Sequence, residues 1–155
     1  MKHFWLFLLA CSSAVSAEVQ PFISGSLQTI VKEYAGRPFI LSLWSANCTH
    51  CPAELKTLGQ LKKRYPKLNL VLVSTDSQEQ SDALAEMAEG FGLGKIPQWV
   101  FADPQGERLR FEIDKQWYGE LPRTYFFDRQ HRATGISGVV EVSQLERWAK
   151  ENSRK

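Results

Sequence analysis

The most constraining feature of this 155-residue sequence is an apolar run that leads directly into a pair of cysteines. Residues 38–44 are apolar almost throughout, which is typical of a strand buried on both faces. The motif Cys-Thr-His-Cys-Pro follows at 48–52, and leucines then recur at helical spacing up to Tyr65. The sequence therefore predicts a buried strand, a short turn that carries both cysteines, and a helix over about 52–65.

The rest of the chain predicts one α/β domain over 18–155. Parallel β-α-β units come first and a hairpin comes last, so we expect a mixed central sheet with helices on both faces. Capping-box spacing after Asp76 or Ser77, and after Ser143, predicts two helix starts. Expected helices cover 26–34, 77–91, 107–113 and a segment from 143 onwards; expected strands cover 68–73, 99–101, 124–127 and 133–140.

The N-terminus has the pattern of an export signal. Lys2 and His3 give a basic start, 4–10 is an apolar run, and 15–17 fits a small-residue cleavage site, so 1–17 is predicted to be a signal peptide. Residues 8–11 also resemble a bacterial lipobox, in which 1–10 is removed and Cys11 is acylated. Both interpretations predict a periplasmic or other extracytoplasmic protein, and only acylation of Cys11 anchors it to a membrane.

Export leaves Cys48 and Cys51 as the cysteines of the mature domain, in a compartment where disulfides persist. A disulfide across so small a loop constrains the unfolded chain very little, which argues against a structural role. A metal site is the second alternative, because thiolates and histidine bind Cu(I) or Zn. A copper carrier would need a ligand beyond His50, and His131 is the other histidine of the mature chain.

A redox role suits the position of the pair. A thiol in the first turn of a helix faces unpaired backbone N–H groups and the positive end of the helix dipole, and both favour the thiolate. A protonated His50 adds to this effect. Pro52 suits the first helical turn, where its missing N–H costs nothing.

Trp44-x-x-x-Cys-x-x-Cys-Pro, a Leu-Pro-x-Thr segment about 70 residues later and a closing amphipathic helix resemble a thioredoxin-fold protein. More narrowly, residues 26–150 resemble the exported TlpA/ResA-like thiol–disulfide oxidoreductases. The resemblance implies a Cys48–Cys51 disulfide as redox centre, with Cys48 as nucleophile and Cys51 as resolving thiol. It also implies a cis proline at Pro122, and substrate contacts from the residues around the pair, namely Trp44, Thr49 and Leu121.

Three positions depart from this family pattern. Ser42 stands where thioredoxins carry a buried aspartate, so proton transfer needs another group, and Glu120 beside the proline loop is a candidate. Asn47 replaces the aromatic residue common before the first cysteine. His50 resembles the oxidising members of the superfamily, because stabilising the thiolate makes the disulfide a stronger oxidant.

We therefore expect an exported protein disulfide reductase without cofactor or bound metal, with a disulfide oxidase or isomerase as the alternative. The segment before Pro122 is too short for the inserted helical domain of DsbA-type oxidases, which favours the reductase. Expected partners are the thiols and disulfides of exported proteins, cytochrome c precursors among the candidates, and an upstream, membrane-bound thiol reductant. The net charge of +2 gives no indication of nucleic-acid binding.

Overall fold

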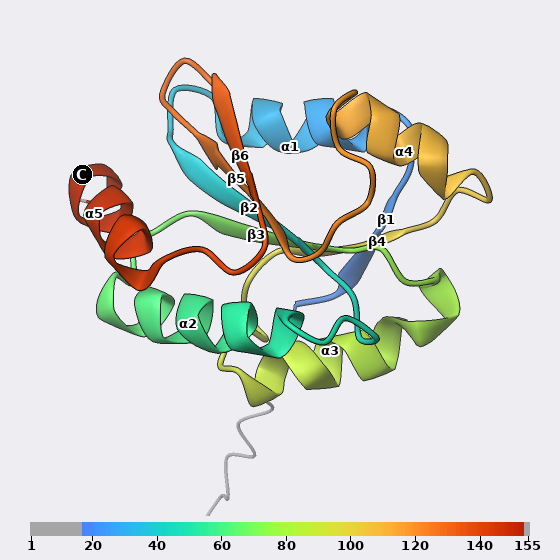
Figure 1. Ribbon diagram of the computed structural model, residues 1–155, viewed down its shortest axis with the longest axis horizontal. Helices are drawn as coiled ribbons and strands as arrows, with labels where there is room; N and C mark the ends of the chain where they lie inside the picture. Colours follow the sequence, from blue (N-terminus) through green and yellow to red (C-terminus); the bar gives the residue numbers. More distant parts are fainter. Residues whose placement is uncertain (1–16, 154–155) are drawn as a thin grey trace, which may run out of the picture.

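The computed structural model describes residues 17–153, which form a single mixed sheet covered by helices on both faces (Figure 1). The strand order is β1-β4-β3-β2-β5-β6. The first four strands in this order run parallel, and β5 and β6 are antiparallel to their neighbours. The strands are β1 (Val19–Phe22), β2 (Phe39–Trp44), β3 (Leu70–Ser74), β4 (Gln98–Phe101), β5 (Arg123–Phe127) and β6 (Ala133–Ser137). The expected fold class is confirmed.

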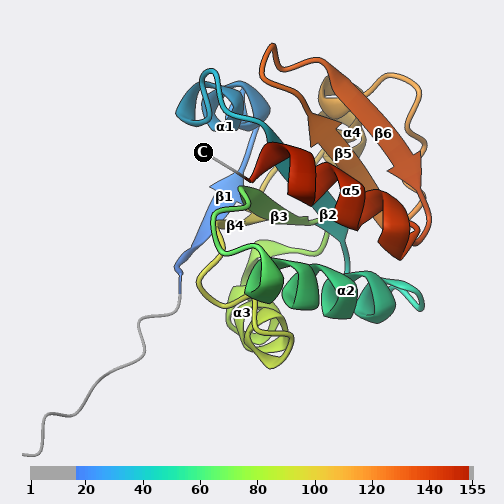
Figure 2. The same cartoon turned by 90° about the vertical axis from the view of Figure 1, so that its left-hand side faces the viewer.

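The sheet separates two hydrophobic cores. Figures 1 and 2 show the helices that cover its two faces. One core packs beneath α2, α3 and α5, and the other beneath α1 and α4. The helices are α1 (Ser26–Glu33), α2 (Cys51–Arg64), α3 (Ser81–Gly90, preceded by a 3-10 turn at Gln78–Gln80), α4 (Gly106–Ile113) and α5 (Val142–Asn152). Because both faces of the sheet are covered, the central strands must be apolar on both sides.

Strand β2 is the clearest case of this double burial. All six of its residues are buried. Ile40 and Trp44 point into the core under α2, whereas Phe39, Leu41 and Leu43 point into the core under α1 and α4. Ser42 belongs to the α2 side by the same alternation. The apolar run at 38–44 is therefore the centre of the fold, and it ends at the cysteine motif.

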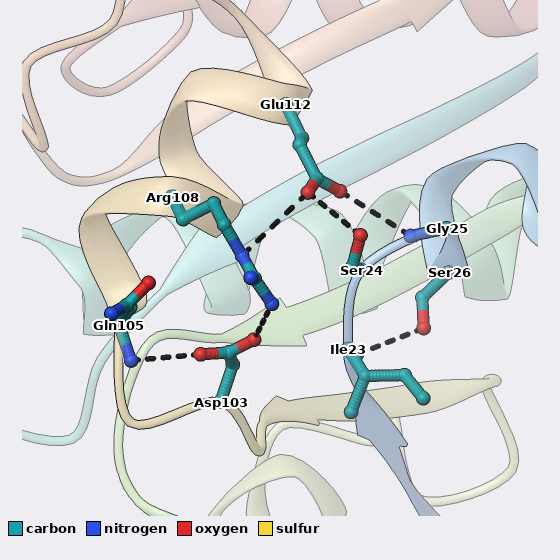
Figure 3. Close-up of polar contacts among 8 residues, drawn as sticks. All are labelled: Ile23, Ser24, Gly25, Ser26, Asp103, Gln105, Arg108 and Glu112. Carbon is teal, nitrogen blue, oxygen red and sulfur yellow. Dashed lines mark hydrogen bonds and ion pairs between the residues drawn. The ribbon is translucent and has the colours of Figure 1, made fainter.

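A polar cluster ties α4 to the connection between β1 and α1 (Figure 3). The Glu112 carboxylate accepts hydrogen bonds from the Ser24 hydroxyl at 2.8 Å and from the Gly25 N–H at 3.3 Å. Arg108 bonds Asp103 just before α4 and lies 3.9 Å from Glu112. These contacts fix α4 on its face of the sheet, and α4 leads directly into the segment that ends at Pro122.

Most expected elements lie within two or three residues of their predicted bounds, but three expectations were wrong. Strand β1 was not predicted, since Gln20 and Pro21 make it polar and irregular. Strand β6 ends at Ser137, because Gly138 turns the chain at φ 83°. In the described chain neither expected capping box forms: α3 and α5 begin without a side-chain cap hydrogen bond. The expected signal sequence and lipobox lie at residues 1–17, of which only Ala17 is among the described residues.

Over residues 17–153, none of the helices is both long and apolar enough to cross a membrane.

Candidate active site

The cysteine pair lies at the edge of the sheet where β2 ends. Strand β2 leaves the sheet at Trp44, and α2 begins at Cys51. In the antiparallel pairing of β2 with β5, Leu43 is opposite Arg123, so Pro122 arrives at the same edge. The Leu121–Pro122 peptide bond is cis, the geometry that the family resemblance implies. The two cysteines and Pro122, more than 70 residues apart in sequence, therefore lie at the same end of the sheet.

Cys48 and Cys51 form a disulfide with a Cα–Cα distance of 5.4 Å. Cys48 is half-buried, whereas Cys51 is fully buried in the core beneath α2. The backbone N–H of Cys51 donates to the Cys48 sulfur at 3.1 Å. This bond comes from the first turn of α2, where N–H groups lack helical partners. On reduction the same donor favours negative charge on Cys48, because it stabilises a thiolate more than a thiol.

Asp76 fixes the turn that carries Cys48. Its carboxylate accepts hydrogen bonds from the Ser45 hydroxyl at 2.8 Å and from the Ala46 N–H at 2.9 Å. The Ser74 hydroxyl, at the end of β3, donates to the same carboxylate at 2.6 Å. Asp76 was expected to cap a helix, but it instead joins the end of β3 to the loop after β2. The position of Cys48 therefore depends on a residue from the neighbouring strand's loop.

Glu54 is a fully buried carboxyl group one helical turn after Cys51. Its Oε1 accepts a hydrogen bond from the Thr124 hydroxyl at 2.9 Å, and its Oε2 accepts one from the Val140 N–H at 3.0 Å. Burial raises the pKa of Glu54 above its usual range, while the bonds from Val140 and Thr124 act in the opposite direction. Cys51 and Glu54 share a face of α2, because residues three apart are neighbours on a helix.

The segment between α4 and Pro122 is fixed from both ends. Arg123 donates to Asp114 at 2.8 Å and to Ser137 at 2.9 Å. The Tyr125 hydroxyl donates to the same Asp114 carboxylate at 3.0 Å, and burial raises the pKa of Tyr125 to about 12. The Trp117 indole N–H donates to the carbonyl of Glu120 at 2.9 Å. These bonds hold the chain in place as it enters the cis proline.

A half-exposed sulfur joined to a buried one at the start of a helix, opposite a cis proline, is the arrangement found at thioredoxin-like redox centres. The AhpC/TSA family profile matches residues 16–134, most of the sequence. This chain belongs to the AhpC/TSA family. Its match extends over β1 to β5 and includes the cysteine pair, Glu54 and Pro122.

Solved structures similar to this AhpC/TSA family member share the thioredoxin-like fold. A secreted Mycobacterium tuberculosis disulfide oxidoreductase, described as homologous to E. coli DsbE, is 17% identical with a TM-score of 0.62, covering 77% of this chain and 85% of its own. StoA from Bacillus subtilis is 20% identical with a TM-score of 0.54, covering 74% and 83%.

The exposed lipoprotein thioredoxin of Streptococcus pneumoniae is 19% identical with a TM-score of 0.56, covering 78% of this chain and 89% of its own. No curated protein sequence matches significantly. The TlpA/ResA-like resemblance agrees with these neighbours.

The remaining predicted site residues differ in how far their side chains are exposed to solvent. Thr49 and His50 are exposed on the turn between the cysteines. Leu121 is half-buried and packs against both cores, including the one that holds the cysteines. Trp44 is only 1% exposed and packs in the core beneath α2. A substrate contact by Trp44 stays a prediction.

The structure gives Glu120 little basis as a proton-transfer group. Its side chain is exposed, and its carboxylate accepts a hydrogen bond from the Tyr118 N–H at 3.2 Å. Glu54 is the buried carboxyl group near Cys51, and the sequence contained a signal for it. Glu54 lies on the helical stripe of Cys51, Leu58 and Leu61, where an acidic residue is out of place.

The alternative of a metal site gains no support from the described part of the chain. Residues 17–153 contain no group of three or more His, Cys, Asp and Glu side chains that could hold a metal ion. His131, the expected additional ligand, bonds the carbonyl of Tyr34 at 2.9 Å and packs edge-on against Phe39. Phe39 begins β2 and the cysteines follow its end, so His131 lies at the opposite end of this strand.

Proposed function

We propose that this protein is an exported thiol–disulfide oxidoreductase that reduces disulfides of other exported proteins. The observation that carries the proposal is the Cys48–Cys51 pair itself: one half-exposed sulfur bonded to one buried sulfur, with the buried Glu54 a turn away. A partner reaches only Cys48, while Cys51 and Glu54 act from within. The secreted and lipoprotein neighbours support an extracytoplasmic location.

The reaction starts from the reduced protein, with Cys48 as the thiolate. Cys48 attacks one sulfur of a partner's disulfide, so that a mixed disulfide forms and the partner's other sulfur leaves as a thiolate, which takes a proton from water. Cys51 then attacks the Cys48 sulfur of this mixed disulfide. The partner's second sulfur leaves as a thiolate and takes a proton from water, so that the partner leaves with two thiols. The protein keeps the two oxidised sulfurs as the Cys48–Cys51 disulfide.

The second step requires Cys51 to lose its proton inside the core. A thiol has a pKa of about 8.5 in water, and an apolar environment raises it. Glu54, when ionised, is the acceptor we assign to this proton, because it is buried beside Cys51 and its raised pKa lies closer to that of a thiol. Glu54 thus takes the role for which Glu120 was considered.

Each cycle consumes two electrons, so a dithiol partner must reduce the Cys48–Cys51 disulfide again. An exported, membrane-bound thiol reductant is the partner of this class that the proposal requires. The chemistry needs no cofactor, since the electrons stay on sulfur throughout.

Two cysteine variants test the proposal. Cys48→Ser should abolish the reduction of insulin disulfides by the protein, because the attacking sulfur is gone. Cys51→Ser should still form the mixed disulfide but not resolve it, and partners should accumulate as covalent adducts on non-reducing gels. Full activity of Cys48→Ser would overturn the proposal.

The direction of the reaction is tested by the reduction potential of the Cys48–Cys51 couple. A potential near that of thioredoxin, about −270 mV, agrees with a reductase. A potential near that of DsbA, about −120 mV, would instead assign the protein as an oxidase. Exposed His50 at the start of α2 is the observation that keeps this second function in view, since its positive charge would stabilise the reduced Cys48 thiolate.

A further inference from the structure

A buried polar arrangement extends from α2 across to β5 behind the cysteine pair. Glu54 contributes both carboxylate oxygens, Thr124 its hydroxyl and Val140 its backbone N–H. Glu54 and Thr124 are fully buried and Val140 is 2% exposed. A buried carboxylate needs partners, because burial without hydrogen bonds disfavours its charge strongly. These two donors come from 70 and 86 residues further along the chain.

We infer that Thr124 is a positioning residue for Glu54: its hydroxyl holds the carboxylate, oriented and ionised, as the acceptor of the Cys51 proton. This inference rests on the proposed function. The Val140 N–H is part of the backbone and always donates. The Thr124 hydroxyl is the one side-chain donor to Glu54 among residues 17–153, so it is the side chain whose replacement changes how strongly the charged form is held.

The neighbouring strand provides an internal comparison. Ser42 is directly opposite Thr124 in the pairing of β2 with β5, so both side chains lie on the same face of the sheet. Ser42 is also fully buried, yet within the described structure its hydroxyl has no hydrogen-bond partner. Two buried hydroxyl groups therefore lie side by side, and only that of Thr124 donates to Glu54.

Few other charges face Glu54. On α2 the titratable residues of the preceding turn are Cys51 and the exposed His50. The residues that contact Glu54 from β5 and the segment before α5 are Thr124 and Val140, and Ser42 of β2 lies opposite Thr124. None of these side chains titrates in the accessible pH range. The protonation of Glu54 thus depends on burial and on its two donors, with Cys51 as the group that exchanges its proton.

A single-turnover reaction of the reduced protein with 5,5′-dithiobis(2-nitrobenzoate) separates the two sulfur steps. Attack by Cys48 releases the first thionitrobenzoate, and attack by Cys51 on the resulting mixed disulfide releases the second. Only the second release requires the proton of Cys51 to reach Glu54. Its rate, followed against pH, therefore reports the ionisation of Glu54 in the intact protein.

Thr124→Val should shift the acid limb of the pH–rate profile of the second release to higher pH by about one unit. The shift is expected because loss of a hydrogen-bond donor to a charged group disfavours the ionised carboxylate of Glu54. The first release should keep its wild-type profile. Thr124→Ser retains the hydroxyl and should restore the second profile, and Ser42→Ala is the matched control that should leave both unchanged. If Thr124→Val does not fold, Thr124→Ala removes the same hydroxyl with less bulk.

Coincident second-release profiles for wild type and the hydroxyl-less variants would overturn the inference. So would an equal shift in Ser42→Ala, since the effect would then belong to any buried hydroxyl on this face. Failure of the proposed function would give a different result. The reduced wild-type protein would then release no thionitrobenzoate through Cys48, and the Cys48→Ser variant would give the same result as the wild type.

Discussion

Glu54 is enclosed by the protein on all sides, and this has a consequence for stability as well as for chemistry. Burial raises its folded pKa above the ordinary value of 4.5. The folded protein therefore binds the Glu54 proton more tightly than the unfolded chain does. Linkage then requires this group to lower stability as pH rises from about 4.5 through the folded pKa, and to have no such effect below 4.5.

Replacement of Glu54 by Gln in the oxidised protein tests whether ionisation of Glu54 lowers the stability of the fold. The amide oxygen can accept from the Val140 N–H, and the amide nitrogen can donate to the Thr124 hydroxyl, so both partners stay satisfied. We expect Glu54→Gln to unfold at the wild-type temperature at pH 4 and a few degrees higher at pH 7. Calorimetry at the two pH values measures this difference.

A variant with an apolar side chain at position 54 serves as the control for Glu54→Gln. Glu54→Leu leaves the Val140 N–H buried without a partner, which costs about 1–3 kcal/mol. It should therefore unfold at a lower temperature than Glu54→Gln at pH 7. A Glu54→Gln protein that is less stable than wild type at pH 7, but equally stable at pH 4, would show that ionised Glu54 stabilises the fold and would contradict this prediction.

The different outcomes for Cys48, Cys51 and Glu54 show what the sequence predicts at the residue scale. The cysteines are recognisable from their local spacing and their place between a strand and a helix. The role of Glu54 depends on donors 70 and 86 residues away, which the local pattern does not contain. Its one local signal is an acidic residue on the buried stripe of α2. The anchoring role of Asp76 depends in the same way on contact between two loops.

At the scale of elements, α2 packs unusually close to the turn after α3. A Cβ atom added at Gly59 would lie 2.0 Å from the carbonyl oxygen of Phe91, which belongs to the backbone and cannot simply move aside. Gly59→Ala should therefore destabilise the protein by about 1–3 kcal/mol, despite the better helix propensity of alanine. Urea unfolding measures this change.

Gly90, at the end of α3, is the matched control for this substitution. A Cβ atom there meets no other heavy atom within 4 Å. Gly90→Ala should leave stability unchanged or raise it by up to about 1 kcal/mol, because only helix propensity changes. Equal effects at Gly59 and Gly90 would contradict the close approach of α2.

Hydrophobic periodicity predicted the elements that bury a full face or stripe, but it missed β1. Strand β1 lies at the edge of the sheet and pairs only with β4, so it tolerates Gln20 and Pro21 and carries little apolar signal. The expected capping boxes failed for a different reason. Ser77 precedes a 3-10 turn, and α5 begins at Val142, one residue before Ser143, the expected cap.

At the scale of the molecule, the proposed function requires a partner to approach the edge of the sheet that carries Cys48. Protein interfaces bury about 800 Å² on each side, equivalent to a disc of about 16 Å radius. Tyr118 is 85% exposed and only four residues before Pro122, hence within about 14 Å of it. The bonds from Trp117 and Tyr118 to Glu120 hold this turn in place. An exposed aromatic side chain on a hydrogen-bonded turn is a favourable contact for a protein partner.

Tyr118→Ala should therefore slow the reduction of insulin by about fivefold, while the reaction with 5,5′-dithiobis(2-nitrobenzoate) stays unchanged because that probe is too small to reach Tyr118. Phe111, which is 57% exposed on α4, is the control, and Phe111→Ala should affect neither reaction. If Tyr118→Ala slows both probes equally, the turn acts on the cysteines and not on the partner.

The parallel direction of β1 and β2 separates two ends of the molecule. Ala17, which bonds the carbonyl of Gly94 at 2.8 Å, precedes the start of β1, whereas the cysteines follow the end of β2. Figure 2 shows the start of β1 and the start of α2 on opposite sides. Any attachment through the residues before Ala17, whether an acyl chain, an affinity tag or a solid support, thus leaves the disulfide facing away from the anchoring surface and open to partners arriving from solution.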